Sequence, residues 1–295
     1  MSGSPPAEVL IDAALVRALL RDQHPDLADL PLKAIDAGWD NQMFRLGDRL
    51  AVRLPRRAFA ANLVIHEQDW LPRLGPRLPI PTPAPVRVGA PGHGYPWRWS
   101  VLPWFDGVPA SAAAANFDQA DRMADFLVAL HQEAPADAPI NPVRGEALER
   151  RAPDVEARLE RLSRATDLIT PALMRAWRAG LSAPTSTAPK WIHGDLHARN
   201  VLVREGVIAA VIDWGDITSG DVATDLAVAW HLFDHPSART RLLQRYGATP
   251  AQIARAMAWA VRIGAILLET GLADHPAHAA MGEAVLRRVS ADSGT

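Results

Sequence analysis

One segment, residues 191–225, limits most strongly what this chain can fold into. Its apolar runs alternate with ionisable residues: W-I-H-G-D-L-H-A-R-N-V-L-V, then V-I-A-A-V-I-D-W-G-D, then G-D-V-A-T-D-L-A. Short apolar runs of this kind indicate buried strands. Ionisable groups at the ends of such strands lie where a site is open to solvent while its support is buried. The segment therefore predicts a functional loop held on small strands.

The secondary-structure signals change along the chain. The first third favours an antiparallel sheet, with a strand at 46–54, a turn at Gly47-Asp48, a strand at 97–105, and helices at 9–21 and 62–74. Helical spacing dominates afterwards, at 117–131, 144–163, 171–181, 222–233, 238–246 and 250–268, interrupted by small strands at 201–203 and 207–212. We therefore predict an α+β fold with a β-rich N-lobe, residues 1–105, and a larger, mainly helical C-lobe, residues 106–295.

Charge and cysteine content exclude several classes of protein. The 31 basic and 33 acidic residues nearly cancel, so no strong positive field indicates nucleic acid as a partner. The chain has no cysteine, which excludes disulfides, thiol nucleophiles and cysteine-bound zinc and suits a cytoplasmic location. No signal peptide and no membrane span are expected, because no basic start precedes an apolar run and no stretch of about eighteen apolar residues is present.

The spacing of two polar residues in the central segment points to phosphoryl transfer. Asp195 and Asn200 form D-x-x-x-x-N, and the next strand ends in Asp213-Trp214-Gly215. Kinases place a catalytic aspartate, a metal-binding asparagine and a D-F-G aspartate in this order. The reaction requires Mg²⁺ held by oxygen ligands and a carboxylate at the attacking hydroxyl. Asn200 and Asp213 can supply the metal ligands, and Asp195 can orient the hydroxyl and accept its proton.

The three strings quoted for residues 191–225, in this order, resemble the aminoglycoside phosphotransferase family of small-molecule kinases. The resemblance implies a protein-kinase-like fold that binds ATP or GTP between its lobes. The resemblance implies that Asp195 is the catalytic base and that Asn200 and Asp213 bind Mg²⁺. It further implies that His193 is structural, and that Asp221 and Asp225 brace the loop and cap the next helix.

The same resemblance extends to the N-lobe. The segment V-L-P-W-F-D-G at 101–107 resembles the linker between lobes, which makes the carbonyl of Pro103 and the N–H of Phe105 candidates for the adenine edge. Gly38 to Asn41 would cover the phosphates. The family usually has a lysine where this chain has Arg53, with Glu67 as the nearest suitable acid. Only two of the 31 basic residues are lysines, Lys33 and Lys190, and neither occupies that strand.

The sequence allows more than one class of phosphate acceptor. The family resemblance implies a hydroxyl of a small molecule, such as an aminoglycoside or related antibiotic, and an amino alcohol or sugar is an alternative. Asp216 and Glu269 are candidates for substrate contact. The presence of Arg53 leaves a non-catalytic nucleotide-binding module as another reading. A metallohydrolase is a third, because His193, Asp195 and His197 alternate and would share one face of a strand.

Overall fold

The computed structural model describes residues 6–35, 40–141, 144–145, 147–185 and 188–294. The chain divides into two compact units. The first unit contains residues 1–106 together with a short return of the chain, Val211–Gly215, and the second contains residues 107–210 and 216–295. The motifs noted in the sequence are thus divided between the units: the D-W-G residues belong to the first unit, and the loop at 193–200 belongs to the second.

A five-stranded antiparallel sheet forms the centre of the first unit. Its strand order is β1-β2-β3-β5-β4. The predicted turn at Gly47-Asp48 is confirmed, since it separates β2 from β3. The strands are β1 (Leu32–Ala34), β2 (Asn41–Leu46), β3 (Leu50–Pro55), β4 (Arg87–Gly89) and β5 (Trp99–Pro103).

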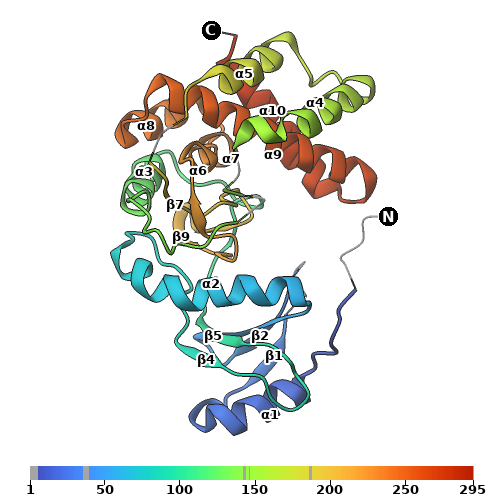
Figure 1. The fold of residues 1–295 in the computed structure, drawn as a ribbon, viewed down its shortest axis with the longest axis vertical. Coiled ribbons are helices and arrows are strands. Elements are labelled where there is room, and N and C mark those ends of the chain that lie inside the picture. The colour runs from blue at the N-terminus through green and yellow to red at the C-terminus, as the bar shows by residue number, and fades with distance from the viewer. Residues whose placement is uncertain (1–5, 36–39, 142–143, 146, 186–187, 295) are drawn as a thin grey trace. The chain divides into compact units, whose positions relative to one another are not determined.

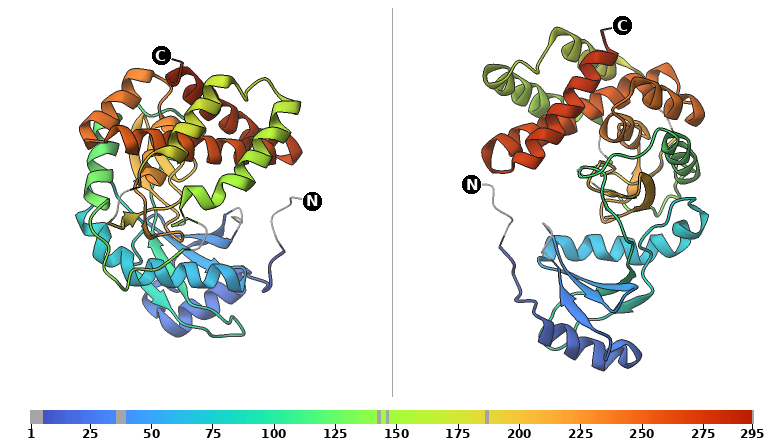
Figure 2. Two further views of the ribbon diagram at one scale, coloured as in Figure 1. Left: turned by 45° about the horizontal axis from the view of Figure 1, so that its top comes forward. Right: turned by 180° about the vertical axis from the view of Figure 1, so that it is seen from behind.

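Two helices cover opposite faces of this sheet, α1 (Ala13–Gln23) and α2 (Ala58–Leu74), as Figures 1 and 2 show. Alternate residues of β3 face each helix. Val52 and Leu54 join the apolar core with α1, whereas Arg53 points to α2 and pairs with Glu67. The sheet is therefore buried on both sides, and a charged side chain on β3 lies in the interior. Short 3-10 turns, η1 (Pro25–Leu27) and η2 (Gly75–Arg77), follow the two helices.

The second unit combines two small sheets with a mainly helical body. One sheet has the order β6-β8-β9, and the other pairs β7 with β10. The strands are β6 (Val108–Pro109), β7 (Lys190–Ile192), β8 (Val201–Arg204), β9 (Val207–Val211) and β10 (Thr218–Gly220). The helices are α3 (Gln119–Leu130), α4 (Leu148–Ala165), α5 (Pro171–Ser182), α6 (Ala223–Leu226), α7 (Val228–Leu232), α8 (Pro236–Tyr246), α9 (Pro250–Asp274) and α10 (Pro276–Asp292).

Helix α9 is the central helix of the second unit (Figure 1). It begins with a capping box, in which the Thr249 hydroxyl accepts from the Gln252 N–H and the Gln252 side chain accepts from the Thr249 N–H. By length and composition alone, residues 250–273 of this helix could cross a membrane, which differs from the expectation that the chain has no apolar stretch of that length. However, 67% of the most apolar stretch is buried inside the protein, as in the core helix of a globular domain.

Candidate functional site

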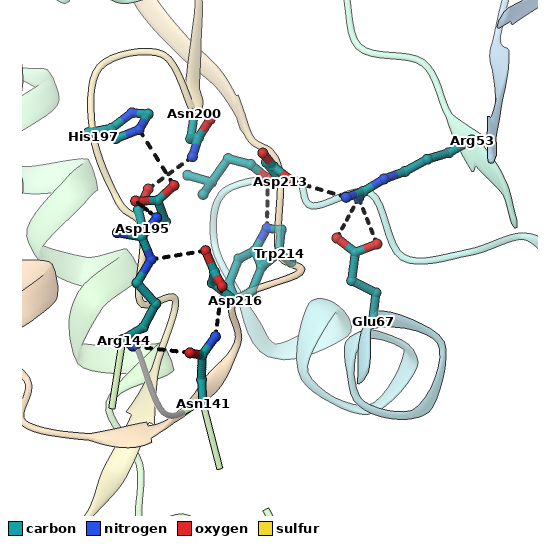
Figure 3. A network of polar contacts seen from close by, with 11 residues as sticks. Arg53, Glu67, Asn141, Arg144, Asp195, His197, Asn200, Asp213, Trp214 and Asp216 are labelled. Carbon is teal, nitrogen blue, oxygen red and sulfur yellow. Dashed lines mark hydrogen bonds and ion pairs between the residues drawn. The ribbon is translucent and has the colours of Figure 1, made fainter. Parts of the chain in front are cut away.

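A buried ion-pair network lies in the first unit, where β3 faces α2 (Figure 3). The Nη1 atom of Arg53 donates to both carboxylate oxygens of Glu67, at 2.5 and 2.6 Å. Its Nη2 atom donates to Oδ1 of Asp213 at 3.0 Å. Arg53 and Glu67 are only 5% and 1% exposed, whereas the Asp213 side chain is 56% exposed. The network thus joins two predicted nucleotide-binding residues to one predicted metal ligand.

Two further groups complete this network. The carboxamide of Asn41, with its oxygen turned toward the guanidinium, accepts from Nε of Arg53 at 3.1 Å and from Nη2 at 2.8 Å. The backbone N–H of Trp214 donates to Glu67. Glu67, Asp213 and Asn41 together accept five hydrogen bonds from Arg53, which matches the five N–H donors of a guanidinium.

Arg53 stays protonated and positively charged in this network. Burial disfavours the charged guanidinium, but the nearby negative charges of Glu67 and Asp213 outweigh burial and raise the pKa of Arg53 above its ordinary value. Asp213 adopts a left-handed backbone conformation, with φ at 62°. Such a conformation costs a non-glycine residue about 1 kcal/mol or more and is least unfavourable for asparagine and aspartate. The Trp214 indole, fully buried, donates to the Val211 carbonyl at 2.9 Å and supports the turn.

The loop that carries Asp195 and Asn200 is fixed in the second unit by a buried carboxylate. Asp225, on α6, accepts the backbone N–H of His193 at 2.6 Å and that of Gly194 at 3.0 Å. The Nε2 atom of His131 lies 3.3 Å from the same carboxylate. Gly194 has φ at +84°, and a Cβ atom there would lie 2.7 Å from the Asp216 carbonyl oxygen. The loop therefore requires glycine at this position.

Asp195 lies at the centre of polar contacts in this unit (Figure 3). Its Oδ1 forms a salt bridge with Nη2 of Arg144 at 2.8 Å, and its Oδ2 lies 3.6 Å from Nε2 of His197. Its backbone carbonyl accepts from Nδ2 of Asn200 at 2.9 Å, and its N–H donates to Nδ1 of His193 at 3.3 Å. The contact with Asn200 turns the amide nitrogen inward and leaves the amide oxygen available for another partner.

Asp216 is held next to Asp195 by the same arginine. Its Oδ2 accepts from Nε of Arg144 at 3.0 Å, and its Oδ1 accepts from the Asn141 amide at 2.7 Å. Burial would raise the pKa of Asp195, but the charges of His197 and Arg144 outweigh burial and lower it. Because burial lowers the pKa of His197 itself, Arg144 is the permanent cation beside Asp195. Burial and the Asp195 charge raise the pKa of Asp216.

The other predicted residues occupy separate positions. Asp221 pairs with Arg255 at 2.6 Å and accepts the Ala223 N–H at the start of α6. Glu269 pairs with Arg158 and Arg161 at 2.6 and 2.8 Å. Pro103 pairs with Leu50 at the end of β5, and Phe105 follows two residues later. Gly38, expected at the phosphates, lies outside the described residues.

Several residues of these networks carry no signal in the sequence. Arg144 and Asn141 lie about fifty residues before the loop that they contact, and one arginine among so many is not distinctive. His131, which contacts Asp225, stands alone at the end of α3. The nearest clue was the helical pattern assigned to 144–163, which actually begins at Leu148 and leaves Arg144 in the preceding turn.

Comparison with known proteins identifies the family. The model of the phosphotransferase enzyme family, APH, matches residues 31–259, which is most of the chain. This chain belongs to that family, and the resemblance found in the sequence is confirmed. The family is one of kinase-type enzymes, and the predicted α+β, kinase-like fold class is confirmed as well. A comparison with curated protein sequences gave no match.

Solved structures share the fold along nearly the whole chain. The GDP complex of wild-type aminoglycoside 2'-phosphotransferase-IIIa has 16% identity and a TM-score of 0.67, and the match covers 96% of this chain and 99% of that one. The macrolide 2'-phosphotransferase MphH from Brachybacterium faecium has 22% identity and a TM-score of 0.59, with 92% and 97% covered. The streptomycin-ATP ternary complex of APH(2'')-IIa has 17% identity and a TM-score of 0.59, with 88% and 90% covered. At these low sequence identities, the similarity shows that the fold is shared and nothing more.

Proposed function

We propose that this protein is a cytoplasmic kinase that transfers the γ-phosphate of ATP or GTP to a hydroxyl group of a small molecule, with Asp195 as the catalytic base. Nucleotide complexes among the structures of similar fold, with GDP in one and ATP in another, support a nucleotide co-substrate. The single observation that carries the proposal is the environment of Asp195: a carboxylate with a lowered pKa, on a loop fixed by Asp225.

The chemistry of Asp195 follows from its contacts. The lowered pKa keeps it ionised at neutral pH, and the salt bridge with Arg144 runs to Oδ1. Since Oδ2 lies 3.6 Å from His197, beyond normal hydrogen-bond length, it retains the capacity to accept a hydroxyl proton. Phosphoryl transfer has a loose transition state in most analyses, so orienting the attacking hydroxyl matters more than a strong base. A weakly basic but correctly placed carboxylate is therefore sufficient.

Asn200 and Asp213 are the proposed Mg²⁺ ligands, and their donor atoms fit a hard cation. The Asn200 amide oxygen is available because its nitrogen is bonded to the Asp195 carbonyl. Asp213 uses Oδ1 for Arg53 and is more than half exposed, and within the described residues Oδ2 is open to a metal ion. Magnesium takes oxygen ligands and usually only one or two from the protein. When bound, it would neutralise charge on the nucleotide phosphates.

Arg53 is proposed to position the nucleotide phosphates in place of the usual lysine. All five of its donors are occupied in this structure, so an incoming phosphate would replace Asn41 or Asp213 as a partner. The Glu67 pair would stay, because it fixes the guanidinium plane from the opposite side. The carbonyl of Pro103 and the N–H of Phe105 are the proposed contacts for the base of the nucleotide.

One variant pair tests the catalytic assignment. Asp195→Asn keeps the side-chain shape and removes the charge, and Asp137→Asn makes the same change at an exposed residue of the same unit. We expect phosphate transfer from labelled ATP or GTP to fall about a hundredfold to ten-thousandfold in Asp195→Asn, the range for a lost general base, and to remain normal in Asp137→Asn. Equal turnover in wild type and Asp195→Asn would refute the mechanism.

A non-catalytic nucleotide-binding module is the second candidate, and one observation favours it. Arg144 occupies one oxygen of Asp195, and every donor of Arg53 is already bonded. Nucleotide-dependent stabilisation without phosphate transfer to any acceptor would support this candidate. The metallohydrolase reading has less support: among the described residues, no group of three or more histidine, aspartate and glutamate side chains is arranged to hold a metal ion.

A further inference from the structure

A cavity of about 290 Å³ opens between α4 and α9 in the second unit. Four arginines line it, three from α4 and one from α9, and the lining contains a single acid, Asp154. The arginines are Arg151, Arg158, Arg161 and Arg262. Glu269 partly offsets the charge of Arg158 and Arg161. The lining thus carries more basic than acidic side chains.

Arg262, on α9, is the most informative member. It is 7% exposed, and within the described part of the chain it forms no salt bridge and no hydrogen bond. Its guanidinium instead lies 5.3 Å from the centre of the Trp259 ring. Burial, followed by repulsion from Arg144, Arg151 and Arg158, lowers the pKa of Arg262 to about 10. A buried guanidinium among other arginines is unfavourable unless an anion joins them.

We propose that this arginine cavity binds the anionic group, a carboxylate or a phosphate, of the molecule whose hydroxyl is phosphorylated. Arginines recognise both groups by bidentate, charge-assisted hydrogen bonds. The cavity volume suits a small ligand group. Arg144, whose positive charge acts on Arg262, forms the 2.8 Å salt bridge with Asp195, so the cavity lies near the proposed base in the same unit.

This inference rests on the proposed function and narrows its substrate class. The structures of similar fold include a complex with kanamycin and one with gentamicin. Such aminoglycosides carry several ammonium groups, and a cavity with four arginines would repel them. Glu269, a candidate for substrate contact, is already paired with two arginines. The acceptor of this chain is accordingly an anionic hydroxy compound.

Binding can be tested without catalysis. Wild type, Arg262→Met and Arg287→Met are titrated with inorganic phosphate and with acetate at constant ionic strength, by calorimetry and thermal unfolding. Arg287 is an exposed arginine on α10 and serves as the control. We expect phosphate or acetate to bind and raise Tm in wild type and Arg287→Met, and Arg262→Met to lose this effect. The more effective anion identifies the phosphate or carboxylate class. No binding to wild type, or equal binding to Arg262→Met, would overturn the proposal.

Transfer assays then separate this inference from the proposed function. Glucose, gluconate, glucose 6-phosphate and glucosamine are compared as acceptors, with kanamycin and water alongside. We expect an anionic compound to be preferred, and Arg262→Met to raise its KM roughly tenfold to a hundredfold, as for a lost charge-assisted hydrogen bond. A preference for glucosamine or kanamycin would overturn the acceptor class. Anion binding with no phosphate transfer to any acceptor or to water would contradict the proposed function but support the anion-binding role of the cavity.

Discussion

At the scale of the residue, Arg53 is the clearest departure from the family pattern. Its partner Glu67 is almost fully buried, so removing the guanidinium leaves an unpaired charge in the interior. We expect Arg53→Met to lower the free energy of unfolding by about 3–5 kcal/mol, the usual loss when one partner of a buried pair is removed. It should also raise the KM for nucleotide. Urea unfolding measures the first effect and steady-state kinetics the second.

A double variant controls this prediction. Arg53→Met combined with Glu67→Gln removes both charges, and we expect it to be more stable than Arg53→Met alone, because no buried charge is left unpaired. If the double variant is no more stable, the ion pair does not determine stability here. If Arg53→Met leaves nucleotide KM unchanged, the nucleotide-binding role of Arg53 is wrong.

His231 provides a prediction about pH. This side chain, on α7, is buried, and its two ring nitrogens have no hydrogen-bond partner among the described residues. Burial, followed by the charge of His197, lowers its pKa from 6.5 to about 3. Below pH 6.5 the unfolded chain therefore takes up a proton that the folded protein excludes. The folded state loses stability as pH falls from 6.5 toward 3, by about 1.4 kcal/mol per unit at most from this group.

Replacing the imidazole tests this effect. We expect His231→Leu to raise Tm relative to wild type at pH 5 by more than it does at pH 7.5, because leucine has no proton to exclude. Thermal unfolding at the two pH values measures the difference. His235→Leu, at an exposed histidine in the same unit, is the control. An identical change in Tm at both pH values for His231→Leu would show that this histidine titrates normally in the folded state.

Residues differ in how far sequence alone could assign them. Asp195, Asn200 and Asp213 could be singled out because their mutual spacing is distinctive in one short segment, and their catalytic and metal-binding roles stay predictions. The pairing of Arg53 with Glu67 was also expected, and the structure has that contact at 2.5 Å. Arg144 and Arg262 were not expected, because their positions depend on tertiary packing and neither stands in a local pattern.

At the scale of the element, most helices and strands agree with the sequence patterns. The exceptions have local causes. The helix expected at 9–21 begins at Ala13, because the Asp12 carboxylate accepts the Leu15 N–H and caps it there. The helix expected at 222–233 is divided into α6 and α7. The helix α10 was not predicted, since its alanines and mixed polar residues give little amphipathic contrast.

The pairing of α9 with α10 depends on close backbone contact. A Cβ atom at Gly282 would lie 2.4 Å from the Leu268 nitrogen and 2.5 Å from the Gly264 carbonyl oxygen. Contacts near Gly271 and Gly264 follow the same antiparallel register, with Ala279 and Leu286 respectively. Glycine thus lets the two helices approach more closely than any residue with a side chain would permit.

Gly282→Ala separates helix propensity from packing. Propensity alone predicts a gain of about 1 kcal/mol in a helix interior. The contacts with α9 predict the opposite, a loss of about 1–3 kcal/mol from overpacking, and we expect the loss to dominate because the opposing atoms are backbone. Chemical unfolding measures the sign. Glu283→Ala, at the next and more exposed position, is the control. A more stable Gly282→Ala variant would mean that α10 can move away without cost.

At the scale of the whole molecule, the fold class could be read from the change between a β-rich first third and a helical remainder. The return of Val211–Gly215 to the first unit could not be predicted from the sequence, because the strand β9 runs on from the second unit without a break in the sequence pattern. Tertiary contacts, rather than local conformational preference, place these residues in the first unit. The D-W-G turn consequently shares its hydrogen bonds with α2 and β3 of the first unit.

Ligand-dependent stability of the whole chain tests the proposed Mg²⁺ and nucleotide sites together. A ligand that binds only the folded state adds about 2.7 kcal/mol at a concentration of one hundred times Kd. We expect ATP or GTP with Mg²⁺ to raise Tm, and EDTA to remove most of the increase, because the phosphates and the proposed ligands Asn200 and Asp213 bind through the metal. Asp213→Asn should reduce the part of the shift in Tm that depends on Mg²⁺, whereas Asp69→Asn, at an exposed position on α2, should not.

If Asp213→Asn keeps the full Mg²⁺-dependent shift in Tm, Asp213 is not a metal ligand. If EDTA leaves the increase in Tm intact, nucleotide binds through the protein alone, and the proposed role of both oxygen donors is wrong.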